Sequence, residues 1–96
     1  SKKYFVFSGI GNHKTFVSMV KNYDLNVLKD LEFSDHHTYT KNDMDEILHQ
    51  ANNLNCEIIT TEKDFQRLNN FKDSRIKVIK TELKIIDENK FMKSII

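Results

Sequence analysis

The chain has 96 residues, with 15 Lys and Arg against 14 Asp and Glu, which leaves a formal net charge of +1. This length allows one domain, and so small a charge provides no field that would hold a nucleic acid or an anionic membrane surface. Hydrophobic residues make up 39% of the chain and charged residues 30%, a balance typical of a folded domain. We therefore expect a single folded domain, residues 1–96, without a nucleic-acid partner.

Three absences narrow the chemistry. The single cysteine excludes an internal disulfide, and no apolar run has the length of a membrane span, so we expect this chain by itself to be soluble. The two glycines, Gly9 and Gly11, cannot form a Walker A loop, which needs two glycines five positions apart followed by Lys and Ser or Thr. Because the chain also begins with serine rather than methionine, we expect a fragment of a larger protein.

In chain order, the first half predicts a strand, a helix and a second strand. Residues 4–8 are an apolar, β-prone run without alternation, which fits a central strand covered on both faces. The turn 9–12 follows, and a helix begins behind it with Asn12 as its cap. Residues 25–33 predict an edge strand, because Lys29 interrupts an otherwise apolar face. That face consists of Leu25, Val27, Leu31 and Phe33.

The second half predicts two further helix and strand pairs. Thr40 with Asp43 has the spacing of a capping box, and Thr61 with Asp64 repeats it before a helix that ends near residue 68. Strands are expected at 56–60 and 76–79, and a short terminal helix is expected on the stripe Phe91, Met92, Ile95 and Ile96. Alternating strands and helices make βαβ units. We predict an α/β fold of three-layer, Rossmann-like βαβ units with a small, mostly parallel sheet of about four strands.

The loops that follow the first three strands are chemically unusual. In a parallel sheet such loops meet at one edge, where ligands of open α/β folds usually bind. The three loops are 9–12, 34–39 and 60–64. We therefore expect them to form one rim.

The first of these loops, Gly9 to Asn12, has two interpretations. Free backbone amides at a helix N-terminus favour a phosphate group, whereas a tight turn that requires a positive φ needs glycine for steric reasons. The same residues serve both, so the pattern alone leaves them open. A dinucleotide-binding fingerprint is a weak match, because Lys14 stands where its third glycine belongs.

The second loop carries the strongest ionisable signal, Asp35, His36 and His37. Histidines can act as general acid or base near neutral pH, and a neighbouring carboxylate can orient them. The alternative is a solvated loop in which Asp35 caps the local backbone. Two adjacent histidines on the expected rim favour the functional interpretation. A metal site has less support, because only one or two ligands are local.

The third loop places Lys63 in the first turn of a helix, where a cation opposes the helix dipole. Such a lysine is tolerated where it has an anion to bind, but spacing alone favours a surface ion pair with Glu62 or Asp64. The remaining candidates are expected to be structural. His49 lies on a solvated helix face, Cys56 is a small buried hydrophobe, and His13 has no obvious partner.

The three segments together resemble one known family. Residues 7–12 (Phe-Ser-Gly-Ile-Gly-Asn), 35–40 (Asp-His-His-Thr-Tyr-Thr) and 60–64 (Thr-Thr-Glu-Lys-Asp) resemble, in order and spacing, the C-terminal part of tetraacyldisaccharide 4'-kinases, the lipid A kinases of Gram-negative bacteria. The resemblance covers about residues 4–83. It departs at His13, where the family usually has a proline. Because proline at the first helical position only presets φ, we expect the turn to be retained.

This resemblance implies a kinase that transfers the γ-phosphate of ATP, with Mg2+, to the 4'-hydroxyl of a tetraacyldisaccharide 1-phosphate in lipid A biosynthesis. It implies that the phosphate-binding loop and the magnesium carboxylates lie in an N-terminal core of the same polypeptide. This chain would then be the smaller, lid-like C-terminal domain, inactive alone and without tight binding of ATP or Mg2+. The whole enzyme would act on a lipid A precursor at the cytoplasmic side of the inner membrane, with membrane contact through its other part.

The resemblance also implies roles for single residues. Phosphoryl transfer depends on positioning and on neutralisation of charge, so His36 first and His37 second are expected to orient or activate the 4'-hydroxyl with a carboxylate of the core. Asp35 is expected to orient a histidine, which completes the expected catalytic set. The expected substrate- or nucleotide-binding set is Gly9, Gly11, Asn12, Tyr39, Thr61, Glu62, Lys63 and Asp64. No metal ligand is expected in this chain.

Three other classes of protein remain as alternatives. They are a stand-alone nucleotide-binding module, a structural docking module without catalytic activity, and a metal-dependent phosphoesterase. None of them explains why the three rim segments occur together.

Overall fold

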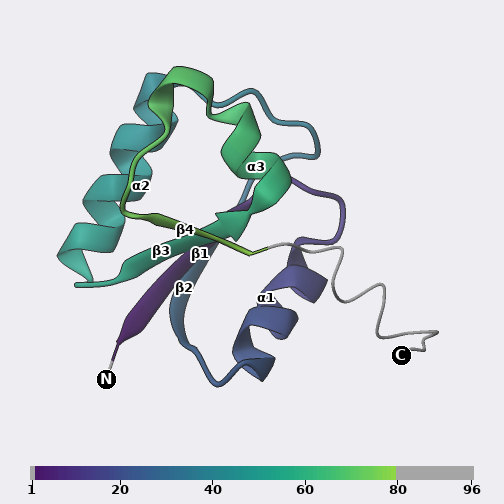
Figure 1. Cartoon of the computed structure of the whole chain (residues 1–96), viewed down its shortest axis with the longest axis vertical. Coiled ribbons are helices and arrows are strands. Elements are labelled where there is room, and N and C mark those ends of the chain that lie inside the picture. Colours follow the sequence, from purple (N-terminus) through teal and green to yellow (C-terminus); the bar gives the residue numbers. More distant parts are fainter. Residues whose placement is uncertain (1, 80–96) are drawn as a thin grey trace.

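The computed structural model describes residues 2–79, and strands alternate with helices along this part of the chain (Figure 1). The elements are β1 (Lys3–Ser8), α1 (His13–Asn22), β2 (Asn26–Glu32), α2 (Lys41–Asn53), β3 (Glu57–Thr61), α3 (Glu62–Arg67) and β4 (Ile76–Ile79). A short 3-10 helix, Asn69–Phe71, follows α3. The helix expected on the Phe91 stripe lies outside the described residues. None of the described helices is long and apolar enough to cross a membrane.

The sheet has the strand order β2-β1-β3-β4, and each neighbouring pair is parallel. The helix α1 packs on one face, and α2 and α3 pack on the other, which makes three layers (Figure 1). Each helix serves as the crossover that parallel strands require. The structure thus confirms the predicted α/β fold, its βαβ units and the interior position of β1.

The strand β1 is buried on both faces, because its alternating side chains enter two separate cores. Phe5 and Phe7 belong to the core beneath α2 and α3, whereas Tyr4 and Val6 belong to the core beneath α1. An apolar run without polar positions predicts such two-sided burial. Because both cores hold β1, the loop that follows it starts from a fixed position.

The strand β2 differs from the prediction that its apolar residues share one face. Tyr4 pairs with Val27, but the next residue of β1 pairs with Lys29, so Leu28 is an extra residue in β2. Such a bulge shifts the alternation by one position. Leu25 and Val27 therefore pack on the α1 side, whereas Leu31 and Phe33 pack on the α2 side. The prediction of an edge strand is confirmed.

Two of the three predicted helix caps are confirmed. Thr40 and Asp43 form a complete capping box at the start of α2, and the Thr61 side chain accepts a hydrogen bond from the backbone N–H of Asp64. Asn12 stands at the predicted N-cap position of α1, but its side chain makes no capping hydrogen bond. The third strand begins at Glu57, one residue later than predicted, and runs directly into α3.

His13 is buried and has two partners, contrary to the prediction that it has none. Its Nε2–H donates to Asp30 on β2 at 2.8 Å, because an ionised carboxylate only accepts. Its Nδ1 then accepts a hydrogen bond from the Ser8 hydroxyl at 2.6 Å. Ser8 is the fully buried last residue of β1. One imidazole therefore joins β1, α1 and β2 below the predicted rim.

Replacing His13 with alanine should lower the free energy of unfolding by about 1–3 kcal/mol, because it leaves the buried Ser8 hydroxyl without its partner. Urea unfolding of the 96-residue chain measures this loss. Lys14→Ala, at the exposed neighbouring position, is the matched control and should stay within about 0.5 kcal/mol of wild type. Equal stabilities of the two variants would contradict the bridging role of His13.

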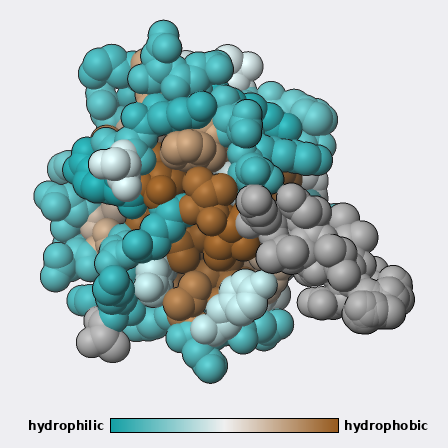
Figure 2. Space-filling view, viewed as in Figure 1, coloured by the Kyte–Doolittle hydropathy of each residue, from teal (hydrophilic) through white to brown (hydrophobic). Residues whose placement is uncertain are grey.

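Each edge strand of the described sheet leaves one large hydrophobic side chain exposed, Leu28 on β2 and Val78 on β4. Hydrophobic residues gather in the middle of the face on which β4 lies, between α1 and α2, and hydrophilic residues surround them (Figure 2). Val78 of β4 remains 39% exposed. The opposite edge, β2, carries the bulge and the exposed charges of Lys29 and Asp30, which are features that protect an edge from further pairing.

Candidate functional site

The segments that follow β1, β2 and β3 meet at one edge of the sheet, as the parallel topology predicts. The backbone of Gly9, just after β1, makes contacts with both of the other segments. Its N–H donates to Asp64 Oδ1 at 2.8 Å, and its carbonyl oxygen accepts from the backbone N–H of His36 at 3.1 Å. The predicted rim is therefore held together by hydrogen bonds across three loops.

Gly9 is needed for close packing and not for an unusual backbone angle. Neither glycine of the chain has a positive φ, so of the two interpretations left open for this turn, the one that needs glycine for a positive φ is wrong. A Cβ atom on Gly9 would lie 3.0 Å from the Ser34 carbonyl oxygen and 3.3 Å from Asp64 Oδ1. At Gly11 the nearest atom, Asp35 Oδ2, would lie at an ordinary 3.5 Å. A side chain at Gly9 would therefore be crowded by its neighbours, whereas one at Gly11 would not.

The carboxylate of Asp64 is the central acceptor of the rim, and its residue is fully buried. Oδ1 accepts from the Gly9 N–H and from the Tyr39 hydroxyl at 2.9 Å. Oδ2 accepts from the Thr61 hydroxyl at 2.6 Å. Burial, followed by the charge of Asp64, raises the pKa of Tyr39 well above its ordinary value, so Tyr39 remains a hydrogen-bond donor. Three loops thus depend on one buried anion.

His37 is held in place by an aromatic ring and a carboxylate. Its ring stacks on Phe33 with 4.6 Å between centroids and meets Tyr39 edge-on at 5.0 Å. Its Nε2 donates to Asp43 Oδ2 at 2.8 Å. Although burial opposes it, the bonds from His37 and Thr40 hold the pKa of Asp43 below its usual value. The carboxylate that orients a histidine is thus Asp43, which also caps α2.

His36 is the most accessible imidazole of the rim, with 79% of its side chain exposed. Its backbone has a φ of 62°, in the left-handed region that residues other than glycine seldom adopt. Its Nδ1 lies 3.2 Å from Nη2 of Arg67. Because a guanidinium only donates, Nδ1 accepts, and the proton of the neutral ring is on Nε2. Asp35 lies 3.8 Å from that Nε2, beyond hydrogen-bond distance.

The two histidines open into a shared surface cavity of about 410 Å³. The loop after β2 and the segment from the end of α3 form its walls. The lining residues are His36, His37, Thr38, Gln66, Arg67 and Asn69. All of these side chains can donate a hydrogen bond, and none is a carboxylate. The cavity is therefore suited to oxygen-rich groups such as hydroxyls and phosphates.

The other residues of the predicted set lie outside this cavity. Tyr39, Thr61 and Asp64 are buried in the network beneath it, whereas Gly11, Asn12 and Lys63 are exposed and Glu62 is half-buried. Lys63 forms no ion pair with any residue in the range 2–79, so its expected surface pairing is not found there. Within the same range, no group of three or more His, Cys, Asp or Glu side chains is arranged to hold a metal ion.

Sequence reasoning missed the role of Arg67 and the second role of Asp43. Arg67 donates to the Gly9 carbonyl at 2.9 Å as well as facing His36, and it lies 3.7 Å from Asp64 Oδ1. Its position three residues after Asp64 is a spacing at which helical side chains meet. That spacing is the signal that points to Arg67, whereas the contact between His37 and Asp43 leaves no comparable pattern.

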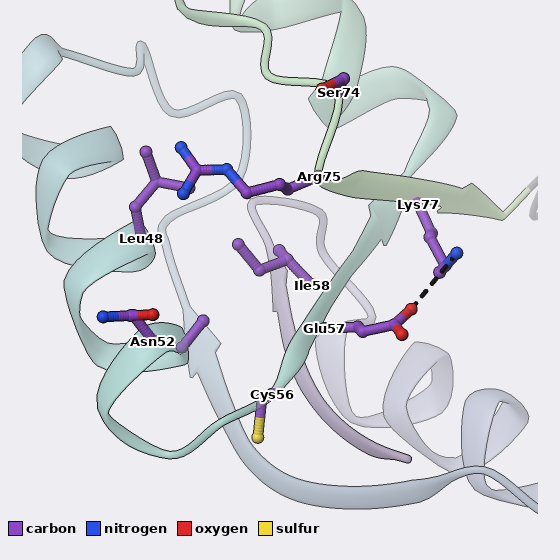
Figure 3. Close-up of a pocket in the computed structure, with 9 residues that line it drawn as sticks. Leu48, Asn52, Cys56, Glu57, Ile58, Ser74, Arg75 and Lys77 are labelled. Carbon is purple, nitrogen blue, oxygen red and sulfur yellow. Dashed lines mark ion pairs between the residues drawn. The ribbon is translucent and has the colours of Figure 1, made fainter.

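A cavity of similar volume, about 420 Å³, lies at the other end of the strands from the rim, where β3 and β4 begin (Figure 3). Leu48 and Ile58 contribute apolar walls, and Glu57 pairs with Lys77 at 3.2 Å on its outer side. Cys56 also lines it, half-buried and packed against the core beneath α2. Burial raises the pKa of the Cys56 thiol, which agrees with its predicted structural role. This cavity contains none of the predicted site residues.

The fold and the rim define a parallel α/β domain that presents two histidines where its strands end, the place at which ligands of open α/β folds usually bind. The family model "Tetraacyldisaccharide-1-P 4'-kinase" matches residues 1–96, and the chain belongs to this family. It is similar to the tetraacyldisaccharide 4'-kinase of Pelagibacter ubique (strain HTCC1062), with 50% identity over 95 residues, 99% of this chain and 30% of that relative. With the tetraacyldisaccharide 4'-kinase of Rickettsia akari (strain Hartford) it shares 39% identity over 85 residues, 88% of this chain and 26% of that relative. The chain thus spans under a third of these curated relatives, and no solved structure matches it.

Proposed function

We propose that this chain is the C-terminal domain of a kinase that transfers the γ-phosphate of ATP to the 4'-hydroxyl of tetraacyldisaccharide 1-phosphate. One observation carries the proposal: the three segments that resemble the family are joined by hydrogen bonds through Gly9, next to a cavity that the second segment and the end of α3 line with polar side chains and no carboxylate. A sugar hydroxyl and phosphate groups are the oxygen-rich ligands that such a lining favours. The description of the family, a tetraacyldisaccharide-1-P 4'-kinase, supports a kinase acting on this substrate.

The proposal assigns ATP and Mg2+ to an N-terminal part of the same polypeptide. Residues 2–79 contain no cluster of His, Cys, Asp or Glu suited to a metal ion, and two glycines do not form a Walker A loop. Residues 2–79 thus offer magnesium no such cluster, and in this proposal no step by this chain is routed through it. The whole enzyme would act peripherally at the cytoplasmic side of the inner membrane, where its lipid substrate is found.

In this proposal His36 orients the acceptor. Its proton is on Nε2, the exposed nitrogen, so His36 donates a hydrogen bond to the 4'-oxygen and does not remove its proton. The hydroxyl proton then passes to a carboxylate of the N-terminal part. His37 holds the loop through Phe33 and Asp43. Orientation of this kind contributes to phosphoryl transfer because the attacking oxygen has to lie in line with the leaving group.

The other residues of the expected set divide into two groups in this proposal. Tyr39, Thr61 and Asp64 form the framework beneath the cavity, because their polar groups are occupied by one another. The exposed residues face the N-terminal part and the nucleotide. They are Gly11, Asn12 and Lys63, with Asp35 beside His36 and Glu62 at the start of α3.

A chimaeric kinase tests the proposal. This chain replaces the matching segment of the Pelagibacter ubique relative, with which it shares 50% identity over 95 residues, and phosphate transfer from ATP to tetraacyldisaccharide 1-phosphate is measured. We expect turnover within about tenfold of the parent enzyme, because the rim geometry is preserved. The unmodified parent and the 96-residue chain alone are the controls, and the chain alone should neither transfer phosphate nor give heat with magnesium ATP in calorimetry.

Two outcomes would contradict the proposal. A chimaera that folds and binds ATP but transfers no phosphate would show that this rim does not serve the reaction of the family. Transfer by the 96-residue chain alone would show that it holds a complete site, and its assignment as one domain of a larger kinase would be wrong.

A further inference from the structure

Arg67 connects all three rim segments through a single guanidinium group. It lies at the end of α3, and its Nη1 donates to the carbonyl oxygen of Gly9, in the loop after β1, at 2.9 Å. Its Nη2 donates to Nδ1 of His36, in the loop after β2, at 3.2 Å. The same Gly9 carbonyl accepts the backbone N–H of His36. The backbone of His36 is thus bound to the Gly9 carbonyl, and its ring is bound to the guanidinium that holds the same carbonyl.

We infer that Arg67 is a positioning residue that sets both the orientation and the tautomer of His36, an inference that rests on the proposed function. A neutral imidazole can carry its proton on either nitrogen. The donor from Arg67 occupies Nδ1 and leaves the proton on Nε2, the nitrogen that the proposed function assigns to the acceptor hydroxyl. Arg67 also offsets the cost of the left-handed backbone at His36, which is on the order of 1 kcal/mol for a residue other than glycine.

The geometry requires arginine in particular. The two terminal nitrogens of the planar guanidinium bind two acceptors on different loops, the Gly9 carbonyl and Nδ1 of His36. Because the group is rigid, it holds these two acceptors at a fixed distance and angle to each other. Asp64, 3.7 Å from Nη1, fixes the charged group from the buried side. A lysine at this position would supply the charge from a single nitrogen and would not hold both acceptors in one fixed geometry.

The tautomer of His36 is measured directly by nitrogen NMR of the imidazole rings in the 96-residue chain. At a pH where the rings are neutral, we expect wild type to show His36 protonated on Nε2 alone, and the two Nη groups of Arg67 to be distinct and slow to rotate. In Arg67→Met and Arg67→Lys, where no donor occupies Nδ1 in this fixed geometry, His36 should become a mixture of the two tautomers. Arg75→Met removes an exposed arginine that pairs with Asp73 and is the matched control, with His36 unchanged.

Turnover of the chimaeric kinase provides the second readout. Arg67→Met should lower kcat by about 10- to 100-fold with little change in KM, because a misplaced orienting group affects the reaction more than binding. This loss should disappear in a His36→Ala background, since Arg67 acts through His36.

Each result that overturns the inference is distinct from a failure of the proposed function. A His36 tautomer that is the same in Arg67→Met and in wild type, or freely rotating Nη groups in wild type, would overturn it in the isolated chain without any reaction. A rise in KM at constant kcat, or a loss that persists in His36→Ala, would make Arg67 a substrate-binding residue instead. Full turnover of His36→Ala alone would overturn the proposed role of His36 and leave the NMR result standing.

Discussion

Glycine at position 36 should give a more stable domain than alanine at the same position, by about 1 kcal/mol, because His36 has a left-handed backbone. The same His36→Gly variant should lower the turnover of the chimaeric kinase by about 100- to 1,000-fold, the effect of removing one donor aimed at a reacting oxygen. Urea unfolding of the 96-residue chain measures the first effect and steady-state kinetics the second. Stability thus distinguishes glycine from alanine at this position, and turnover distinguishes histidine from glycine.

His49 provides the matched control for this comparison. It is an exposed histidine inside α2. There the alanine variant should be about 1 kcal/mol more stable than the glycine variant, as in any helix interior. Neither substitution of His49 should affect turnover. If alanine were the more stable residue at position 36 as well, the left-handed conformation of the loop would be contradicted. Full turnover of His36→Gly would contradict its contact with the acceptor.

Replacing Asp64 with alanine should lower the free energy of unfolding by about 3–5 kcal/mol, the usual effect of removing one partner from a buried, charged network. The variant leaves the Gly9 N–H and the hydroxyls of Tyr39 and Thr61 without their acceptor in a fully buried position. Since a domain of this size has about 5–15 kcal/mol in total, much of its stability would be lost. Urea unfolding is the measurement, and Lys63→Ala, one exposed residue away, should stay within about 0.5 kcal/mol of wild type.

Tyr39→Phe keeps the test of Asp64 informative where Asp64→Ala does not fold. It removes one of the three donors and should cost about 1 kcal/mol. Because both substitutions act on the same hydrogen bond, their effects should be strongly non-additive. A loss below about 1 kcal/mol in Asp64→Ala, or additive effects of the two substitutions, would contradict the central place of Asp64 in the rim.

Most of the fold can be predicted from the sequence, because periodic burial leaves a periodic pattern. The apolar run at 4–8 predicts the interior strand, and Thr40 with Asp43 predicts the start of α2, as the structure confirms. The faces of β2 are not predictable in this way. A bulge is a property of the pairing between two strands, so Leu28 carries no signal in its own sequence.

The candidate site is predictable at the level of segments and not at the level of bonds. Parallel topology brings the three loops together whatever their side chains do. The bonds within the rim depend on rotamers and join residues far apart, such as Arg67 with Gly9, 58 positions away. His13 illustrates the same limit, because its partners Ser8 and Asp30 come from two strands whose register is unknown beforehand.

The bulge in β2 makes the length of that strand as important as its composition. The apolar residues before Leu28 face one core and the apolar residues after it face the other, so the hydrophobic face of the strand changes sides half-way along. Loss of a single residue there would restore regular alternation and turn Phe33 away from the ring of His37, which stacks on it. A deletion in this edge strand, at a distance from the cavity, would thus misplace His37, although the hydrophobic content of the strand would hardly change.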